Sequence, residues 1–148
     1  MKTNKSNKVI IKRKLFKNKT KRNYKHSTII IEFLETLNTI KLYHWKTATY
    51  PTHDATNELQ QKLIEIIDQF VKVLVEKNGK RISILDHHLK LYDLNSQKDF
   101  TNKMFEFRQL LVEFERSFDP INDFDLFDVR DKILFHINQF LYLLTFEN

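Results

Sequence analysis

Apolar residues recur at helical spacing along four separate stretches of the chain. In the first stretch, residues 28–47, they step by three and four positions and so share one face of a helix. These positions are Ile30, Phe33, Leu34, Leu37 and Ile40. His44 is the next position on that face. Ser27 is the predicted N-cap of this helix. Pro51 is expected to separate it from the next helix, because proline cannot continue an ordinary helical turn.

A second and longer helix is predicted over residues 53–78. Thr52 is placed as its N-cap, and Gly79 as the left-handed residue that ends it. Its apolar positions are Leu59, Leu63, Ile66, Ile67, Phe70, Val71, Val73 and Leu74. At 1.5 Å per residue, such a helix is roughly 39 Å long. Residues 80–95 then form a long connection, in which residues 84–92 favour a short helix.

The third and fourth helices are predicted in the C-terminal half of the chain. Ser96 and Asp99 have the spacing of a capping box and open the third helix, which ends near Pro120. Its apolar steps alternate between four and three, through Phe100, Met104, Phe107, Leu111, Phe114 and Phe118. The fourth helix covers about residues 125–146. Its predicted core face comprises Leu126, Val129, Ile133, His136, Phe140 and Leu143.

Four helices joined by a short, a long and a short connection predict an all-α protein. The long connection makes the second and third helices parallel, as in a ferritin-like four-helix bundle with one long crossover. We therefore expect a bundle domain over residues 27–148, preceded by a tail of residues 1–26. One glycine and two prolines leave little turn chemistry for a multi-stranded sheet.

Composition narrows the protein class further. The chain has no cysteine, which excludes disulfides and thiolate chemistry and fits a reducing compartment. No apolar run approaches the roughly 20 residues that span a bilayer, and the N-terminus has no apolar signal-peptide core. We expect a protein that is soluble, is not secreted and has no membrane partner.

The net charge of +6 conceals a division along the chain. Residues 1–26 contain eleven of the 25 Lys and Arg residues and no acidic residue, whereas the remainder has fourteen basic and nineteen acidic residues. Such a tail should be largely disordered when free, and should bind nucleic acid through phosphate contacts. The candidate contacts are Lys12, Arg13, Lys14, Lys17, Lys19, Lys21, Arg22 and Lys25. Alternatives are a nuclear-import-like signal over residues 12–22, an arm that orders inside a virion, and a solvated extension without function.

The residues with metal chemistry are His44, His53 and Asp68. His44 ends the first predicted helix and His53 opens the second, fifteen residues before Asp68. Fifteen residues leave His53 and Asp68 within about 60° of each other around the helix, but about four turns apart along it. One chain therefore cannot bring both side chains to one ion.

This pattern resembles the Dps proteins of the ferritin-like superfamily. Their first helix ends with a His-Trp pair, here His44 and Trp45, a second His opens the next helix, and an Asp follows fifteen residues later. The resemblance implies a site between two subunits, with His from one subunit facing carboxylates from the other. The chain is most similar to an uncharacterised Dps-like family of large DNA viruses, which shares the LYHW opening and the NQFLYL ending at residues 138–143.

Two positions depart from the Dps pattern, which has an acid four residues after the second His and another four after the Asp. Asn57 and Lys72 stand at those positions, and the interval from His44 to His53 is shorter than in Dps. A lysine ammonium repels a cation and cannot coordinate it. Glu58 is a candidate replacement that faces about 100° away from Asn57. Iron or another divalent metal is the cofactor implied by the resemblance, and no metal is the alternative.

Each candidate also has a purely structural interpretation. His44 on an apolar stripe suits a hydrogen-bonded core or interface histidine, and Asp68 a salt-bridge partner of Lys72. Trp45 is interpreted as a packing anchor and His136 as a packed core residue. His87 and His88 are interpreted as solvated.

The combined prediction is a Dps-like homo-oligomer, from a dimer to a dodecamer, with a degenerate metal site. Its basic tail would bind nucleic acid or virion components, in a virion or in the cytoplasm or nucleus of a host. Two alternatives remain: an active mini-ferritin that oxidises and stores iron at an intersubunit site, and a purely structural virion protein.

Overall fold

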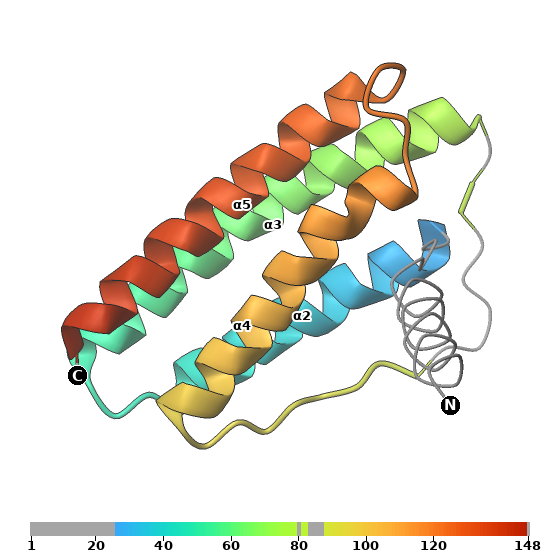
Figure 1. Ribbon diagram of the computed structural model, residues 1–148. Coiled ribbons are helices and arrows are strands. Elements are labelled where there is room, and N and C mark those ends of the chain that lie inside the picture. Colours follow the sequence, from blue (N-terminus) through green and yellow to red (C-terminus); the bar gives the residue numbers. More distant parts are fainter. Residues whose placement is uncertain (1–25, 80, 83–87, 148) are drawn as a thin grey trace, which may run out of the picture.

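The computed structural model describes residues 26–79, 81–82 and 88–147, and in these residues the chain is all-helical (Figure 1). The α-helices are α2 (His26–Lys46), α3 (Tyr50–Asn78), α4 (Gln97–Val112) and α5 (Phe124–Leu144). Short 3-10 turns, η1 (Glu113–Arg116) and η2 (Thr145–Glu147), follow α4 and α5. The all-α prediction is thus confirmed for the described residues. The predicted state of the tail concerns residues 1–25, which lie outside them.

Helices α3 and α4 run in the same direction, and α2 and α5 run opposite to both (Figure 1). Each helix packs against two others: α2 against α3 and α4, and α5 against the same two helices. The long connection returns the chain from the end of α3 to the opposite end of the bundle, where α4 begins. Three residues separate α2 from α3 and eighteen separate α3 from α4, so the predicted short and long connections are present. The predicted end of the third helix near Pro120 is wrong, because the backbone tightens into the 3-10 turn η1 after Val112, and eleven residues separate α4 from α5.

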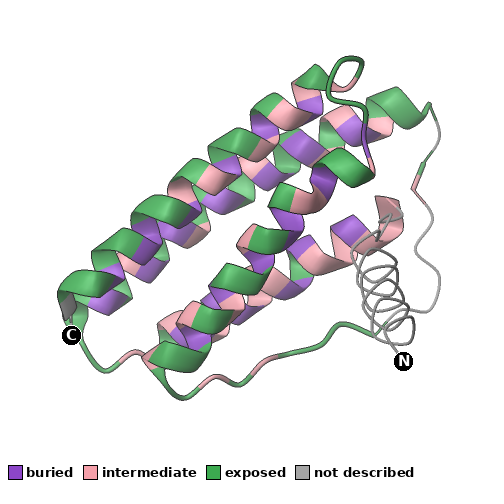
Figure 2. Cartoon of the chain, in the orientation of Figure 1, coloured by how far each residue is buried: buried purple, intermediate pink, exposed green. Residues whose placement is uncertain are grey.

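Aromatic side chains fill the centre of the bundle, where the buried residues of all four helices face inward (Figure 2). The ring of Phe33 on α2 has its centroid 5.3 Å from that of Phe70 on α3 and 5.9 Å from that of Phe107 on α4. Both pairs are edge to face, which is the favourable geometry for aromatic rings. Near the start of α4, Phe100 stacks on Tyr43 with 4.0 Å between the ring centroids. All six apolar positions predicted for the third helix are buried.

The helix ends agree with the sequence in part. Gly79 ends α3 at φ 63°, with its amide donating to the carbonyls of Val75 and Glu76, as predicted. Ser27, however, lies inside α2 rather than before it. Similarly, α3 begins at Tyr50, so Thr52 lies in its first turn. Pro51 also lies in that turn, where its missing N–H costs nothing because the first amides of a helix have no intrahelical partner.

The core face of α5 is rotated from the predicted one. Leu143 is 49% exposed and His136 is only partly buried, whereas Ile137, Leu141 and Leu144 are buried. Ile133 and Phe140 belong to both faces, and Ile137 and Leu144 are buried in place of His136 and Leu143 because α5 turns that side toward α3 and α4.

The described part of the crossover has no helix, so the expected short helix is wrong for residues 88–92. The segment is held by Glu35, a buried carboxylate on α2 that accepts a hydrogen bond from the backbone amide of Lys90 at 2.9 Å. At the end of the crossover, Lys46 pairs with Asp93 and donates to Asn95. Within the described residues, no helix has the length and apolar character needed to cross a membrane.

Candidate functional site

His44 and His53 meet at the turn between α2 and α3. The two helices run antiparallel and are separated by only three residues, which brings the last turn of α2 against the first turn of α3. The imidazole rings stack with 3.9 Å between their centroids and 28° between their planes. His44 is partly buried and His53 is exposed. The sequence analysis placed both residues at helix ends, and the structure brings them into contact.

Hydrogen bonds determine which nitrogen of each ring carries the proton. Nδ1 of His44 lies 2.9 Å from the carbonyl oxygen of His53, and Nδ1 of His53 lies 3.2 Å from the carbonyl oxygen of His44. A carbonyl oxygen only accepts hydrogen bonds, so Nδ1 must be the donor in both rings. Nε2 then carries a lone pair in each neutral ring. Metal-binding histidines commonly have this arrangement, in which one nitrogen is fixed by a carbonyl and the other is available.

Two threonines complete the arrangement, and the sequence analysis did not identify them. The hydroxyl of Thr56 lies 2.9 Å from Nδ1 of His44, and that of Thr47 lies 3.3 Å from Nδ1 of His53. Thr47 also donates to the carbonyl oxygen of His44 at 3.0 Å. The signal is present in the sequence: each histidine is followed by a threonine three positions later, which is one helical turn. In this turn, the threonine that follows each histidine contacts the other histidine.

Asp68 does not join the histidines. It lies in a groove between α2 and α3 that is lined by Ile30, Leu34, Leu37, Val71 and Lys72. In the described residues, no group of three or more His, Cys, Asp or Glu side chains could hold a metal ion. His53 and Asp68 both lie on α3, so the expected separation of about four turns between them holds within one chain.

The predicted salt bridge between Asp68 and Lys72 is wrong. Both side chains are exposed, and among the described residues no ion pair joins them. Four residues apart on α3, they have the spacing of a helical ion pair, but solvent competes for both charges.

The altered positions on α3 do not rebuild a carboxylate site. Asn57 is exposed, one turn after His53. Glu58 pairs with Lys62 at 2.9 Å and lies in a different groove, beside His136 on α5. The hydrogen bond from Lys62 lowers the pKa of the Glu58 carboxyl. Glu58 therefore faces away from the histidine pair and does not replace the missing acid.

The remaining candidates are peripheral. Trp45 is 67% exposed, with the ammonium of Lys41 5.5 Å from its ring centroid, so it is not a packing anchor within this chain. His88 is exposed as predicted, and His87 lies outside the described residues. The eight candidate nucleic-acid contacts between Lys12 and Lys25 also lie outside them.

Comparisons of the chain with protein-family models, with curated proteins and with solved structures each gave no match.

Proposed function

We propose that this protein is an oligomeric, ferritin-like bundle of the Dps type, from a large DNA virus, whose basic tail binds nucleic acid without reading its sequence. The observation that carries the proposal is the separation of charge along the chain. Residues 1–26 hold eleven cationic residues and no acid, while residues 27–148 hold more acids than bases. Cations clustered in this way displace the counterions of nucleic-acid phosphates, which gives salt-sensitive binding that does not depend on sequence.

The arrangement of the helices supports the ferritin-like part of the proposal. A long crossover between the parallel helices α3 and α4 is the connection that distinguishes such bundles from up-and-down bundles. The contacts of α2 with α3 and of α4 with α5 fit two helical hairpins. The paired histidines, with Asn57 and Lys72 where the Dps pattern has acids, support the description of the metal site as degenerate.

A gel shift with the full chain and two matched triple variants tests nucleic-acid binding. The tail variant is Lys12→Gln, Lys14→Gln and Lys17→Gln, and the control variant is Lys41→Gln, Lys98→Gln and Lys132→Gln. Both lose three positive charges. If all three tail lysines contact phosphates, the slope of log affinity against log salt concentration should fall by about 3 in the tail variant.

The control variant should retain the slope of the wild-type chain. Equal affinities and equal slopes for all three proteins would contradict nucleic-acid binding by the tail. The tail would then serve packing against neighbouring subunits in a virus particle, or the protein would be a purely structural virion component.

A second candidate function, metal binding at an intersubunit site, is favoured by the histidine pair. Both rings have Nδ1 bound to a carbonyl oxygen and Nε2 free to accept, which suits imidazole ligation of iron or zinc. Two imidazoles from one chain leave coordination positions for a carboxylate from elsewhere. This candidate would make the protein a mini-ferritin if two iron ions were bound and oxidised.

The surface around Asp68 supplies a face on which a second copy could provide that carboxylate. Leu34 on α2 and Ile64 on α3 are each 42% exposed; Leu34 lines the same groove as Asp68, and Ile64 lies one helical turn before Asp68 on α3. The positions of His53 and Asp68 share one face of α3, separated by about four turns. A two-fold dimer through this face would place Asp68 of one copy opposite the histidine pair of the other. Lys72 lowers the expected affinity for a cation, because its charge lies one turn from Asp68.

A further inference from the structure

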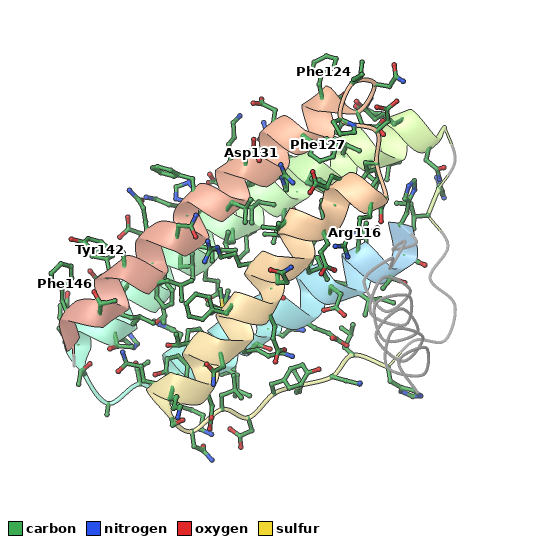
Figure 3. All side chains as sticks on the ribbon, viewed as in Figure 1. Arg116, Phe124, Phe127, Asp131, Tyr142 and Phe146 are labelled. Carbon is green, nitrogen blue, oxygen red and sulfur yellow. The ribbon has the colours of Figure 1, made fainter. Side chains whose placement is uncertain are left out.

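A second groove lies at the opposite end of the bundle from the histidine pair, where α4 passes into α5. We name it the acidic groove, and it is lined by Glu115, Phe124, Phe127, Asp128, Arg130 and Asp131. Figure 3 shows Phe124, Phe127 and Asp131 on the first turns of α5, near the loop that joins α4 to α5. Phe124 is 69% exposed and the neighbouring Ile121 is 83% exposed. The groove therefore combines exposed apolar surface with carboxylates.

Negative charge is in excess around this groove. Residues 113–131 contain seven acidic and two basic residues. Lys77 pairs with Asp125 at 2.9 Å, and Arg130 pairs with Asp131 at 2.9 Å. Two carboxylates that line the groove, Glu115 and Asp128, have no cation within salt-bridge distance among the described residues. They are available to a cationic partner.

The chain enters the bundle next to this groove. The imidazole of His26, the first described residue, stacks on the ring of Phe118 with 5.6 Å between the centroids. Phe118 is buried two residues before Pro120, in the segment that leads from α4 to the groove. Residues 1–25 are therefore attached to the bundle at its acidic end, which gives them a high local concentration at the groove.

The tail has the side chains that such a groove would accept. Residues 8–17 read KVIIKRKLFK, so apolar and basic residues are interleaved. Phe16 precedes His26 by ten residues, and ten residues of extended chain span at most roughly 35 Å. The apolar side chains match the exposed rings of the groove, and the cations match its free carboxylates.

We propose that the acidic groove is a docking site for the basic tail of the same chain, with residues 8–17 as the segment that binds. The tail's apolar residues cover Phe124 and Ile121, and its lysines and arginines pair with Glu115 and Asp128. Docking requires no nucleic acid and so goes beyond the function proposed above. Where the tail does bind nucleic acid, phosphates compete with the groove for the same cations, and the groove limits access to the tail.

Disulfide trapping tests the proposal directly, because the chain has no cysteine of its own. Phe16→Cys is combined with Ile121→Cys beside the groove or, as the matched control, with Asn78→Cys at the end of α3, which lies at the same end of the bundle but does not line the groove. Both bundle positions are exposed. Under mild oxidation, the groove pair should form an intramolecular disulfide about tenfold faster than the control pair, because docking raises the effective concentration at the groove.

The rates are measured from monomer bands on non-reducing gels, at low salt and at about 1 M salt, where charges are screened within about 3 Å. High salt should remove most of the difference between the two pairs. Equal rates at low salt would overturn the docking, and disulfides formed only between two chains would overturn its assignment to one chain.

Two charge variants distinguish the effect of the groove carboxylates from the effect of the overall negative charge of the bundle. Glu115→Gln with Asp128→Gln removes the two free carboxylates, and Asp54→Gln with Glu65→Gln removes two exposed carboxylates from α3. Trapping by the groove pair should slow severalfold in the first background only. An unchanged rate in the first background would contradict the proposal. Nucleic acid is absent throughout, so a failed trap concerns docking alone and leaves the gel shift to test the proposed function.

Discussion

His136 is held on α5 in a setting that opposes its protonation. Partial burial, together with the positive charge of Lys62, lowers the pKa of the His136 imidazole below its ordinary value of 6.5, while Glu58 raises it by less. The unfolded chain therefore binds this proton more tightly than the folded one. The free energy of unfolding should fall as the pH drops through 6.5 toward the folded pKa, and the full contribution is present above 6.5.

His136→Gln should consequently reduce the loss of stability between about pH 7.5 and about pH 5, measured by urea unfolding at each pH. Lys62→Gln is the electrostatic control, because it removes the nearby charge and should raise the pKa of His136, followed by the imidazole proton signals in NMR. Identical pH profiles for the wild-type chain and His136→Gln would show that His136 titrates alike in both states.

At the same scale, the sequence identified the two histidines of the candidate site but not how they interact. Helical spacing placed His44 and His53 at neighbouring helix ends. The proton position depends on which carbonyl oxygen each ring faces, and that is set by the three-residue turn between the helices. Trp45 shows the opposite error: a large apolar side chain suggested a packing anchor, yet its position on α2 faces solvent.

The beginning of α4 allows the strength of a helix cap to be measured. The hydroxyl of Ser96 accepts a hydrogen bond from the amide of Asp99 at 3.1 Å. Ser96→Ala removes this acceptor and should lower the free energy of unfolding by about 1 kcal/mol. For a domain of this size the melting temperature should fall by about 2–4 °C, measured by circular dichroism.

Ser27→Ala is the matched control, because Ser27 lies inside α2, where alanine is the better helix former. It should leave the melting temperature unchanged or raise it slightly. A similar loss for both substitutions would indicate that the Ser96 hydroxyl contributes nothing as a cap.

Caps also explain why helix existence was easier to predict than helix ends. The stripe predicted for the third helix was correct at all six positions, because steps of four and three determine which face is buried, although Phe114 lies in η1 and Phe118 beyond it. The starts of α2 and α3 were misplaced because serine, threonine and proline are compatible with a cap and with a first helical turn. On α5, His136 and Leu143 fitted the pattern nearly as well as Ile137 and Leu144, and only packing against α3 and α4 decides between them.

For the whole molecule, connection lengths were enough to predict the helix directions. A long segment between the second and third helices can return the chain to its starting end, and α3 and α4 are parallel as a result. The anchors of that segment were not predictable, because a buried glutamate such as Glu35 accepts the amide of Lys90 only once α2 lies beneath the crossover. The contact between two copies of the chain is likewise not predictable from the spacing of residues within one sequence.

Mixing two defective chains tests the proposal that a metal site forms between subunits. One chain carries His44→Ala with His53→Ala, and the other carries Asp68→Ala. In a two-fold dimer each chain alone has both sites damaged, but a mixed dimer has one site with both histidines from one chain and Asp68 from the other. With random pairing, the mixture should recover about a quarter of the wild-type capacity for Zn²⁺, measured by titration calorimetry, because half of the dimers are mixed and each has one intact site.

Asp54→Ala serves as the control for Asp68→Ala, since Asp54 is an exposed acid at the start of α3. It should bind Zn²⁺ as the wild-type chain does. A mixture that binds no more Zn²⁺ than its separate components would exclude a shared site, and full binding by Asp68→Ala alone would assign the ion to the histidine pair of a single chain. The proposal that the site is degenerate has its own test, because Lys72→Glu adds a carboxylate one turn after Asp68 and should increase the affinity of the mixed dimer for Zn²⁺.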